Sequence, residues 1–281
     1  ATSSDPGLIP EANILLGGSG ANRTVTLTPT AEASGSAQIT VAVSDGELTA
    51  TRQFTLTVNS VNDLPTVTTI PNQSIDEDES TTALSLTVGD EETGPGSIIV
   101  SGTSGNPTLV PDSNITLGGS GPNRTVTVTP APDQFGTAQI TVIVSDGVDS
   151  VTSAFTLTVN SINDAPTLTG IANQNIDEDA TAGPVSFQVG DVESEAGSLV
   201  LSGSSSDPAL VPEGNITFCG SGANSTVTLS PAADQFGSAQ ITITVGDGSL
   251  EASQTFTLVV NSVEDAPGAP LNLRVAQVSV E

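Results

Sequence analysis

Lysine, histidine, methionine, tryptophan and tyrosine are all absent from the 281 residues, and the basic side chains are four arginines. Without lysine or histidine the chain lacks an imine-forming amine and a side chain that titrates near neutral pH, so most acid–base and nucleophilic catalysis is excluded. The 32 acidic residues give a formal net charge of -28. That charge excludes a nucleic-acid binder, because phosphate recognition requires clustered basic groups. We therefore expect a protein that is not an enzyme.

Cysteine, aromatic residues and long apolar runs are scarce as well. The single cysteine, Cys219, excludes an internal disulfide. Seven phenylalanines are the only aromatic residues, so any core must be built from Val, Ile, Leu and Ala and must be small. Apolar runs such as residues 140–144 are strand-sized and interrupted by threonine, which excludes a membrane-spanning helix. We recognise no leader or anchor in this stretch and expect it to be a fragment of a longer chain.

Internal repetition is the main organising feature that the sequence does contain. Asp63, Asp164 and Asp265 lie 101 residues apart, and other markers keep the same step without insertion or deletion. The repetition predicts two complete repeats, residues 63–163 and 164–264, preceded by the C-terminal part of a truncated repeat at residues 1–62. Residues 265–281 are predicted to be a linker and the first strand of a domain that resembles fibronectin type III.

Within each repeat, apolar β-branched residues alternate with threonine and serine, as in residues 84–88, 125–129, 140–144 and 155–159. A period of two is typical of strands with one buried face. Clusters of Gly, Pro, Asn and Asp separate these runs, and about seven strands fit into one repeat. The sequence therefore predicts an all-β protein of tandem seven-stranded Greek-key β-sandwiches of the immunoglobulin-like type, without useful helices.

The acidic residues gather between the expected strands and at the borders of the repeats. The same set returns in both complete repeats: a Glu-Asp pair, an acidic pair spaced by one residue, a lone Asp, an Asp-Gly turn, and Asn-Asp or Glu-Asp at the border. In the first complete repeat these are Glu77-Asp78, Asp90-x-Glu92, Asp133, Asp146-Gly147 and Asn163-Asp164; in the second they are Glu178-Asp179, Asp191-x-Glu193, Asp234, Asp247-Gly248 and Glu264-Asp265.

This arrangement resembles the cadherins and the bacterial cadherin-like tandem repeats of large surface proteins. The Glu-Asp pair is similar to the cadherin Glu-Asn pair, the spaced acidic pair to the Asp-x-Asp loop, and Asn163-Asp164-Ala165-Pro166 to the Asn-Asp-Asn-x-Pro linker. By that resemblance, the base of one domain, the linker and the top of the next domain jointly hold Ca²⁺. Ala165 and Gln134 stand where the family has further ligands, so we expect fewer or weaker ions than in cadherins.

The residues that we predict as metal ligands comprise the acidic set of both repeats together with the border residues. They are Asp63, Glu77, Asp78, Asp90, Glu92, Asp133, Asp146, Asn163, Asp164, Glu178, Asp179, Asp191, Glu193, Asp234, Asp247 and Asp265.

A physical argument supports the same ion. Two carboxylates about 4 Å apart repel by roughly 4 kcal/mol at an effective dielectric near 20, so several of them converge only around a cation. Calcium accepts six to eight oxygen ligands and suits Asp, Glu, Asn and backbone carbonyls. Four arginines are too few to replace it. The alternative is that these acids only solvate surface turns, as charged loops often do.

The function predicted from these observations is non-enzymatic: a calcium-rigidified tandem-repeat stalk of an extracellular or cell-surface adhesin or filament. Its expected partners are the neighbouring repeats, and in addition other copies in a filament or a cell-surface ligand. One alternative is a protomer of a head-to-tail fibre that strand exchange completes at the truncated repeat. Another is a passive spacer of a secreted polysaccharide-active enzyme, which the fibronectin-like segment permits.

Three other signals carry less weight. Paired carboxylates could serve a glycoside hydrolase, but the chain has no aromatic platform for a sugar, and catalysis would not require a copy in every repeat. Six Asn-x-Ser/Thr patterns, including Asn123-Arg-Thr125, match the glycosylation acceptor motif in a chain rich in threonine and serine. Cys219 occupies a position that is glycine in the other repeats; a neutral substitution in a turn explains it, and the alternative is an intermolecular disulfide.

Overall fold

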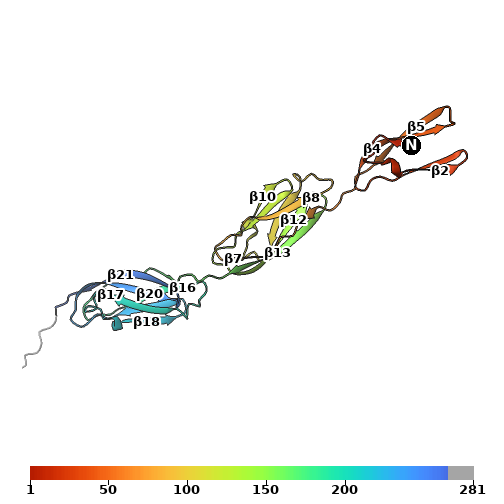
Figure 1. Cartoon of the computed structure of the whole chain (residues 1–281). Helices are drawn as coiled ribbons and strands as arrows, with labels where there is room; N and C mark the ends of the chain where they lie inside the picture. Colours follow the sequence, from red (N-terminus) through yellow and green to blue (C-terminus); the bar gives the residue numbers. More distant parts are fainter. Residues whose placement is uncertain (265–281) are drawn as a thin grey trace, which may run out of the picture. The chain divides into compact units, whose positions relative to one another are not determined.

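The computed structural model describes residues 1–264 (Figure 1). The chain divides into two compact units: residues 1–161, which contain β1 to β13, and the part from residue 162 onward, which contains β14 to β21. No α-helix is present in residues 1–264, where the helical segments are the single 3₁₀ turns η1 (Glu11–Asn13), η2 (Asp112–Asn114) and η3 (Glu213–Asn215). Within that range no helix is long and apolar enough to cross a bilayer.

The strands from β6 to β13 form a sandwich of two four-stranded sheets, ordered β10-β11-β8-β6 and β7-β13-β12-β9. Its strands are β6 (Thr66–Val67), β7 (Gln73–Asp76), β8 (Leu84–Gly89), β9 (Ile99–Ser104), β10 (Ile115–Ser120), β11 (Asn123–Val128), β12 (Gly136–Ser145) and β13 (Ser150–Asn160). The short β6 pairs antiparallel with β8, whereas β7 pairs parallel with β13. The first strand of the predicted seven is thus divided between the two sheets.

The second unit repeats this architecture strand for strand, with sheets ordered β14-β16-β19-β18 and β15-β21-β20-β17. Its strands are β14 (Thr167–Leu168), β15 (Gln174–Asp177), β16 (Ala182–Gly190), β17 (Val200–Ser205), β18 (Ile216–Ser221), β19 (Asn224–Leu229), β20 (Gly237–Gly246) and β21 (Glu251–Asn261). The parallel pairing of β15 with β21 reproduces that of β7 with β13. The all-β class and the tandem β-sandwich predicted from the period-two pattern are confirmed.

The strands of residues 1–62 correspond to β9 through β13. They are β1 (Thr2–Ser3), β2 (Ile14–Ser19), β3 (Asn22–Leu27), β4 (Gly35–Ser44) and β5 (Thr49–Val58). They form a three-stranded sheet ordered β1-β4-β5 and the separate hairpin β2-β3. In residues 1–62 no strand takes the places that β6, β7 and β8 occupy in the sandwich that follows. The predicted borders of the repeats stay a prediction.

Alternating residues of the long hairpin strands supply each core. Ile140, Val142 and Val144 of β12 and Leu157 of β13 are fully buried between the two sheets, whereas Thr141 and Ile143, which alternate with the β12 residues, lie on the opposite face of the sheet and are half-buried. Side chains of β1 to β5 are more exposed than their equivalents in the following sandwich: Val43 is 65% exposed, whereas its equivalent Val144 is 0% exposed. The valine-rich, nearly aromatic-free core follows from the composition and needs both sheets for its closure.

Equivalent phenylalanines of β5 and β13 test this difference in packing. Phe155 is 2% exposed, and Phe54 is 41% exposed. Replacing a buried Phe by Ala typically costs about 3–5 kcal/mol, because apolar contacts are lost and a cavity remains. We expect Phe155→Ala to cost that amount and Phe54→Ala roughly half or less. Hydrogen exchange of the β12 and β4 amides measures both losses, and equal losses would contradict the packing described here.

Candidate metal sites

The loop that follows β8 holds the first acidic group of the sandwich. Asp90 Oδ1 accepts hydrogen bonds from the backbone N–H groups of Glu92 (3.0 Å) and Thr93 (2.6 Å). Its other oxygen, Oδ2, is buried and accepts no hydrogen bond. The equivalent Asp191 binds the N–H groups of Glu193 (3.1 Å) and Ser194 in the same way, and its Oδ2 is likewise buried without a partner. Both loops therefore present a desolvated carboxylate oxygen that a ligand could satisfy.

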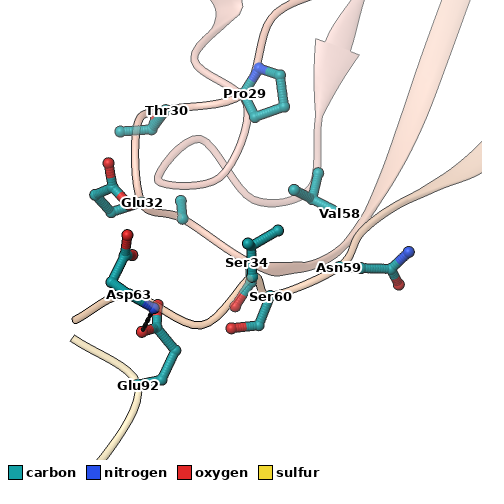
Figure 2. A pocket seen from close by; sticks show the side chains of 11 residues that line it. Pro29, Thr30, Glu32, Ser34, Val58, Asn59, Ser60, Asp63 and Glu92 are labelled. Carbon is teal, nitrogen blue, oxygen red and sulfur yellow. Dashed lines mark hydrogen bonds between the residues drawn. The ribbon is translucent and has the colours of Figure 1, made fainter. Parts of the chain in front are cut away.

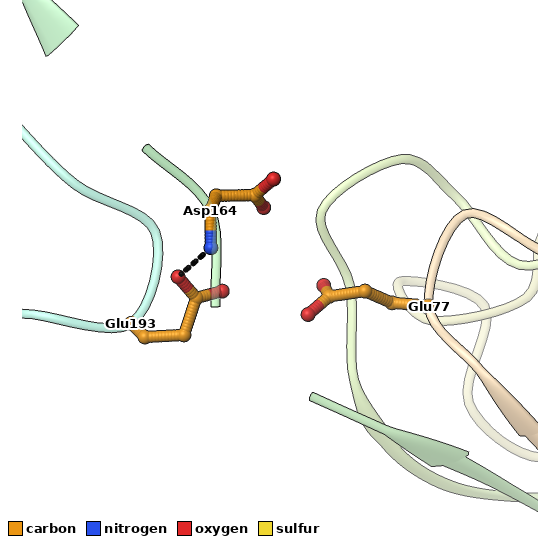
Figure 3. Close-up of side chains that lie close together, drawn as sticks. All are labelled: Glu77, Asp164 and Glu193. Atoms are coloured by element: carbon orange, nitrogen blue, oxygen red, sulfur yellow. Dashed lines mark hydrogen bonds between the residues drawn. The ribbon is translucent and has the colours of Figure 1, made fainter. Parts of the chain in front are cut away.

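The second acid of each loop contacts the linker. The backbone N–H of Asp63 donates to Glu92 Oε2 at 3.1 Å. In the second unit the N–H of Asp164 donates to Glu193 Oε2 at 3.0 Å, as Figure 3 shows. The remaining oxygen of Glu193, Oε1, is buried and has no hydrogen-bond partner. This bond places the side chain of the linker aspartate next to the acidic loop.

The Asp-Gly turns complete this end of each sandwich. Backbone N–H groups of Asp149 and Val148, followed by the Asn62 amide, lower the pKa of Asp146. The N–H of Leu250 and then the Asn163 amide lower the pKa of Asp247. These carboxylates are therefore held in the charged form by donors to their oxygens. We call Asp63, Asp90, Glu92 and Asp146 the leading cluster of the first unit, and Asp164, Asp191, Glu193 and Asp247 that of the second.

A second set of carboxylates, the trailing cluster, lies at the other end of each sandwich. It comprises Glu77, Asp78 and Asp133 in the first unit and Glu178, Asp179 and Asp234 in the second. The N–H of Asp133 donates to Asp78 Oδ1 at 3.2 Å, and the N–H of Asp234 donates to Asp179 Oδ1 at the same distance. Glu77 is only 5% exposed. Glu178 Oε1 accepts the N–H of Val263 at 2.6 Å.

Apart from glycine, left-handed backbone occurs at the trailing clusters and at Glu32, the equivalent of Asp133 one repeat earlier. In residues 1–264 the non-glycine residues with positive φ are all acidic: Glu32, Asp78, Asp133, Asp179 and Asp234, with φ between 55° and 63°. This conformation costs an L-residue roughly 1–2 kcal/mol, less for Asp than for Glu. Such local strain gathers at functional sites more often than elsewhere.

The leading and trailing clusters of one sandwich cannot share an ion. Strand β8, Leu84–Gly89, runs from the trailing end to the leading end. Six residues at about 3.3 Å each separate the ends by roughly 20 Å. A site that uses both kinds of cluster must therefore combine the trailing cluster of one repeat with the leading cluster of the next.

The first unit contains one such combination. Glu32, Asp63 and Glu92 line a pocket of about 230 Å³ beside the linker (Figure 2). The negative charge of Asp63, a hydrogen bond with Asp63, and the charges of Glu91 and Glu92 raise the pKa of Glu32. A raised carboxyl pKa marks a place where negative charges crowd without a compensating cation. The pocket thus has the negative charge and the ligand oxygens that a cation site requires.

The structure brings together most of the acids predicted from the sequence, in two clusters per sandwich. Asn163 lies at the leading cluster, where it bonds Asp247. Asp265 and the fibronectin-like segment lie outside the described residues. Glu32 and Asn62 were not among the predicted residues, although a 101-residue step back from Asp133 and Asn163 leads to both. Asp149, whose Oδ2 accepts a hydrogen bond from Asn62, was not predicted either; its equivalents at positions 48 and 250 are leucine, so the repetition could not reveal it.

Residues 163–259 match the family model described as bacterial Ig domain. The chain contains tandem β-sandwiches, one of which matches this family model. Bacterial Ig domains are generally extracellular or at the surface and typically non-catalytic. A search of curated proteins found no match.

Several solved structures are similar to the Ig-like array. Protocadherin PcdhgB3 EC1-4 is 15% identical with a TM-score of 0.46, and the likeness covers 93% of this chain and 66% of that one. Protocadherin gammaB7 EC3-6 is 20% identical with a TM-score of 0.43, covering 92% and 66%. An endo-fucoidan hydrolase of glycoside hydrolase family 107 is 16% identical with a TM-score of 0.34, covering 90% of this chain and 38% of its own. None of these likenesses transfers a function.

Two substitutions of Asp133 separate its backbone role from its charge. Asp133→Gly and Asp133→Ala both remove the carboxylate, but only glycine adopts the positive φ of 55° without strain. We expect the alanine variant to be less stable than the glycine variant by about 1 kcal/mol. Urea unfolding in the presence of chelator measures the difference without interference from bound ions. An alanine variant as stable as the glycine variant would show that the left-handed conformation is not retained in solution.

Proposed function

We propose that this chain is part of an extracellular structural or adhesive protein in which calcium at the junctions of Ig-like repeats stiffens a tandem-repeat stalk. The observation that carries the proposal is the buried, unpartnered Oδ2 of Asp90, which recurs at Asp191 in the next repeat. An ionised oxygen without a donor is costly inside a protein, and the same cost at the same place in two repeats is explained by a ligand that satisfies both.

The donor set favours calcium over other cations. All candidate ligands are carboxylate or carbonyl oxygens, which hard divalent cations prefer, and histidine is absent from the chain. Each acidic loop offers two carboxylates from residues two positions apart, and the linker adds a third next to them. Magnesium prefers few protein ligands and a rigid octahedron, whereas calcium accepts many carboxylates in an irregular arrangement.

The junction in the first unit supports the sharing of ions between repeats. Glu32 comes from the repeat before the linker, Asp63 from the linker and Glu92 from the repeat after it. Without a cation, repulsion between these three carboxylates favours separation of the two repeats from the linker. With a cation, the same crowding draws the two repeats and the linker together. By the 101-residue step, Asp164, Asp191 and Glu193 are the equivalents of Asp63, Asp90 and Glu92.

The consequence of ion binding is mechanical. A flexible string of sandwiches becomes a semi-rigid rod when each junction is cross-linked, because bending would then break metal–oxygen bonds. The partners in this role are the neighbouring repeats, and adhesion or assembly would rest on surfaces of a longer protein. A surface location fits the charge of -28, which keeps such rods apart and soluble.

Thermal unfolding with and without calcium tests the proposal. A ligand at about one hundred times its Kd adds roughly 2.7 kcal/mol per site to the free energy of unfolding. We expect the chain to melt at a clearly higher temperature in calcium than in excess chelator. Asp191→Asn should lose part of this gain, because its unpartnered oxygen is replaced, and the exposed Glu213→Gln serves as the control. Identical melting curves in calcium and chelator would refute calcium binding.

The crowded acid of the first junction gives a second test. Glu32→Gln removes one negative charge from the crowded group of Glu32, Asp63 and Glu92, so in chelator the variant should be at least as stable as the natural chain. In calcium it should gain less than the natural chain, because one ligand charge is missing. The matched control is Glu11→Gln, an exposed acid of the same group of strands. Calcium titration calorimetry measures the loss, and an unchanged affinity would remove Glu32 from the site.

A further inference from the structure

The asparagine before each linker aspartate makes an unusual set of contacts. The Asn62 amide nitrogen donates to Asp146 Oδ2 at 2.9 Å, to Asp149 Oδ2 at 3.1 Å and to the backbone carbonyl of Asp63 at 2.9 Å. Asp146 and Asp149 belong to the turn between β12 and β13 of the repeat that follows the linker. One amide group therefore ties the linker to the repeat after it through charge-assisted hydrogen bonds.

The second unit repeats the arrangement. The Asn163 amide nitrogen donates to Asp247 Oδ2 at 2.8 Å and to the carbonyl of Asp164 at 3.0 Å. Residue 250 is leucine in place of the aspartate at position 149, so the third bond is lost. Two copies with the same core of contacts show that the arrangement belongs to the repeat and not to one loop.

Two neighbouring features also anchor the linker to the repeat that follows it. The N–H of the linker aspartate donates to the glutamate of the acidic loop, at 3.1 Å for Asp63 and 3.0 Å for Asp164. Two residues further along, Pro65 and Pro166 are buried in the following repeat. On the other side of Asn62, Ser60 and Val61 are exposed coil, and Val61 is 77% exposed. In the first unit, the contacts of the linker with the following repeat thus begin at the asparagine.

We propose that Asn62 and Asn163 are positioning residues that clamp each linker aspartate onto the repeat that follows it. The clamp contacts are N–H···O hydrogen bonds to carboxylate and carbonyl oxygens, which need no cation to form. The linker aspartate is then in place at the acidic loop before calcium arrives, and the ion has only to capture the acids of the preceding repeat. This last consequence rests on the proposed function, whereas the clamp itself does not.

The proposal differs from the role predicted for Asn163 in the sequence, that of a metal ligand. A ligand would offer its amide oxygen to the ion, whereas a clamp offers its N–H group to Asp247. Asn163→Asp separates the roles, because aspartate keeps an oxygen ligand but cannot donate and places a second negative charge against Asp247. Asn163→Ala removes both functions.

The test is hydrogen exchange of the full chain in excess chelator, read at the linker amides of residues 163–167. In the natural chain we expect these amides to be protected, and in Asn163→Ala and Asn163→Asp to exchange about tenfold faster or more, since a hydrogen bond to a charged group is lost. Asn160→Ala is the matched control: its amide also binds a carboxylate, Asp76, at 3.0 Å, but within the repeat that precedes the linker. It should leave the linker amides unchanged.

Several outcomes decide the matter. Linker amides of the natural chain that exchange freely in chelator and become protected only in calcium overturn the clamp. An Asn163→Asp variant that keeps natural protection in chelator overturns it as well. Amides of β20 report whether each variant folds, and Asn62→Ala with residues 62–66 repeats the test in the other unit. The calcium effect on the natural chain is measured separately, so a failure of calcium binding leaves the clamp result intact.

Discussion

Repulsion between carboxylates, with almost no cationic side chains to offset it, is the constraint on which this architecture depends. Thirty-two acids face four arginines. Arg23 and Arg124 donate to backbone carbonyls, of Gly18 and of Pro95 respectively. The crowding that raises the pKa of Glu32 is therefore left for a ligand outside the chain to relieve. Without an ion, repulsion between the carboxylates would push the two sides of the junction apart. With an ion bound, as we propose, the same carboxylates would hold the two sides together.

Backbone hydrogen bonds make this crowding possible by fixing the acids before any ion binds. One oxygen of Asp90 and one of Asp191 accept two N–H groups each, which leaves the other oxygen buried and directed by the loop. The left-handed backbone at Asp78 and Asp133 fixes the trailing cluster in a similar way. Because the loops are ordered in advance, an ion would lose little free energy to the ordering of its ligands.

The residues that stabilise each sandwich and the residues of the candidate metal sites lie in different parts of it. The β12–β13 hairpin and its equivalents bury valine, isoleucine and leucine in the middle, while the charged groups lie at the two ends. Strands carry the ends about 20 Å apart, so the two clusters of one repeat cannot hold the same ion. Repetition is thus a requirement of the proposed function, because each trailing cluster needs the leading cluster of a neighbour. The proposed asparagine clamp assigns the linker aspartate to the repeat that follows it.

The sequence by itself determined the strands, the all-β class and the acidic positions, because period-two alternation and the 101-residue step are local or additive features of the chain. It could not show that the first strand divides between two sheets, since the parallel pairing of β7 with β13 joins residues about eighty positions apart. It also could not show which oxygen of Asp90 stays unsatisfied, or that Asn163 faces Asp247 with its donor side. Only the tertiary structure decided these points, because hydrogen bonds and burial arise between segments whose proximity no local pattern encodes.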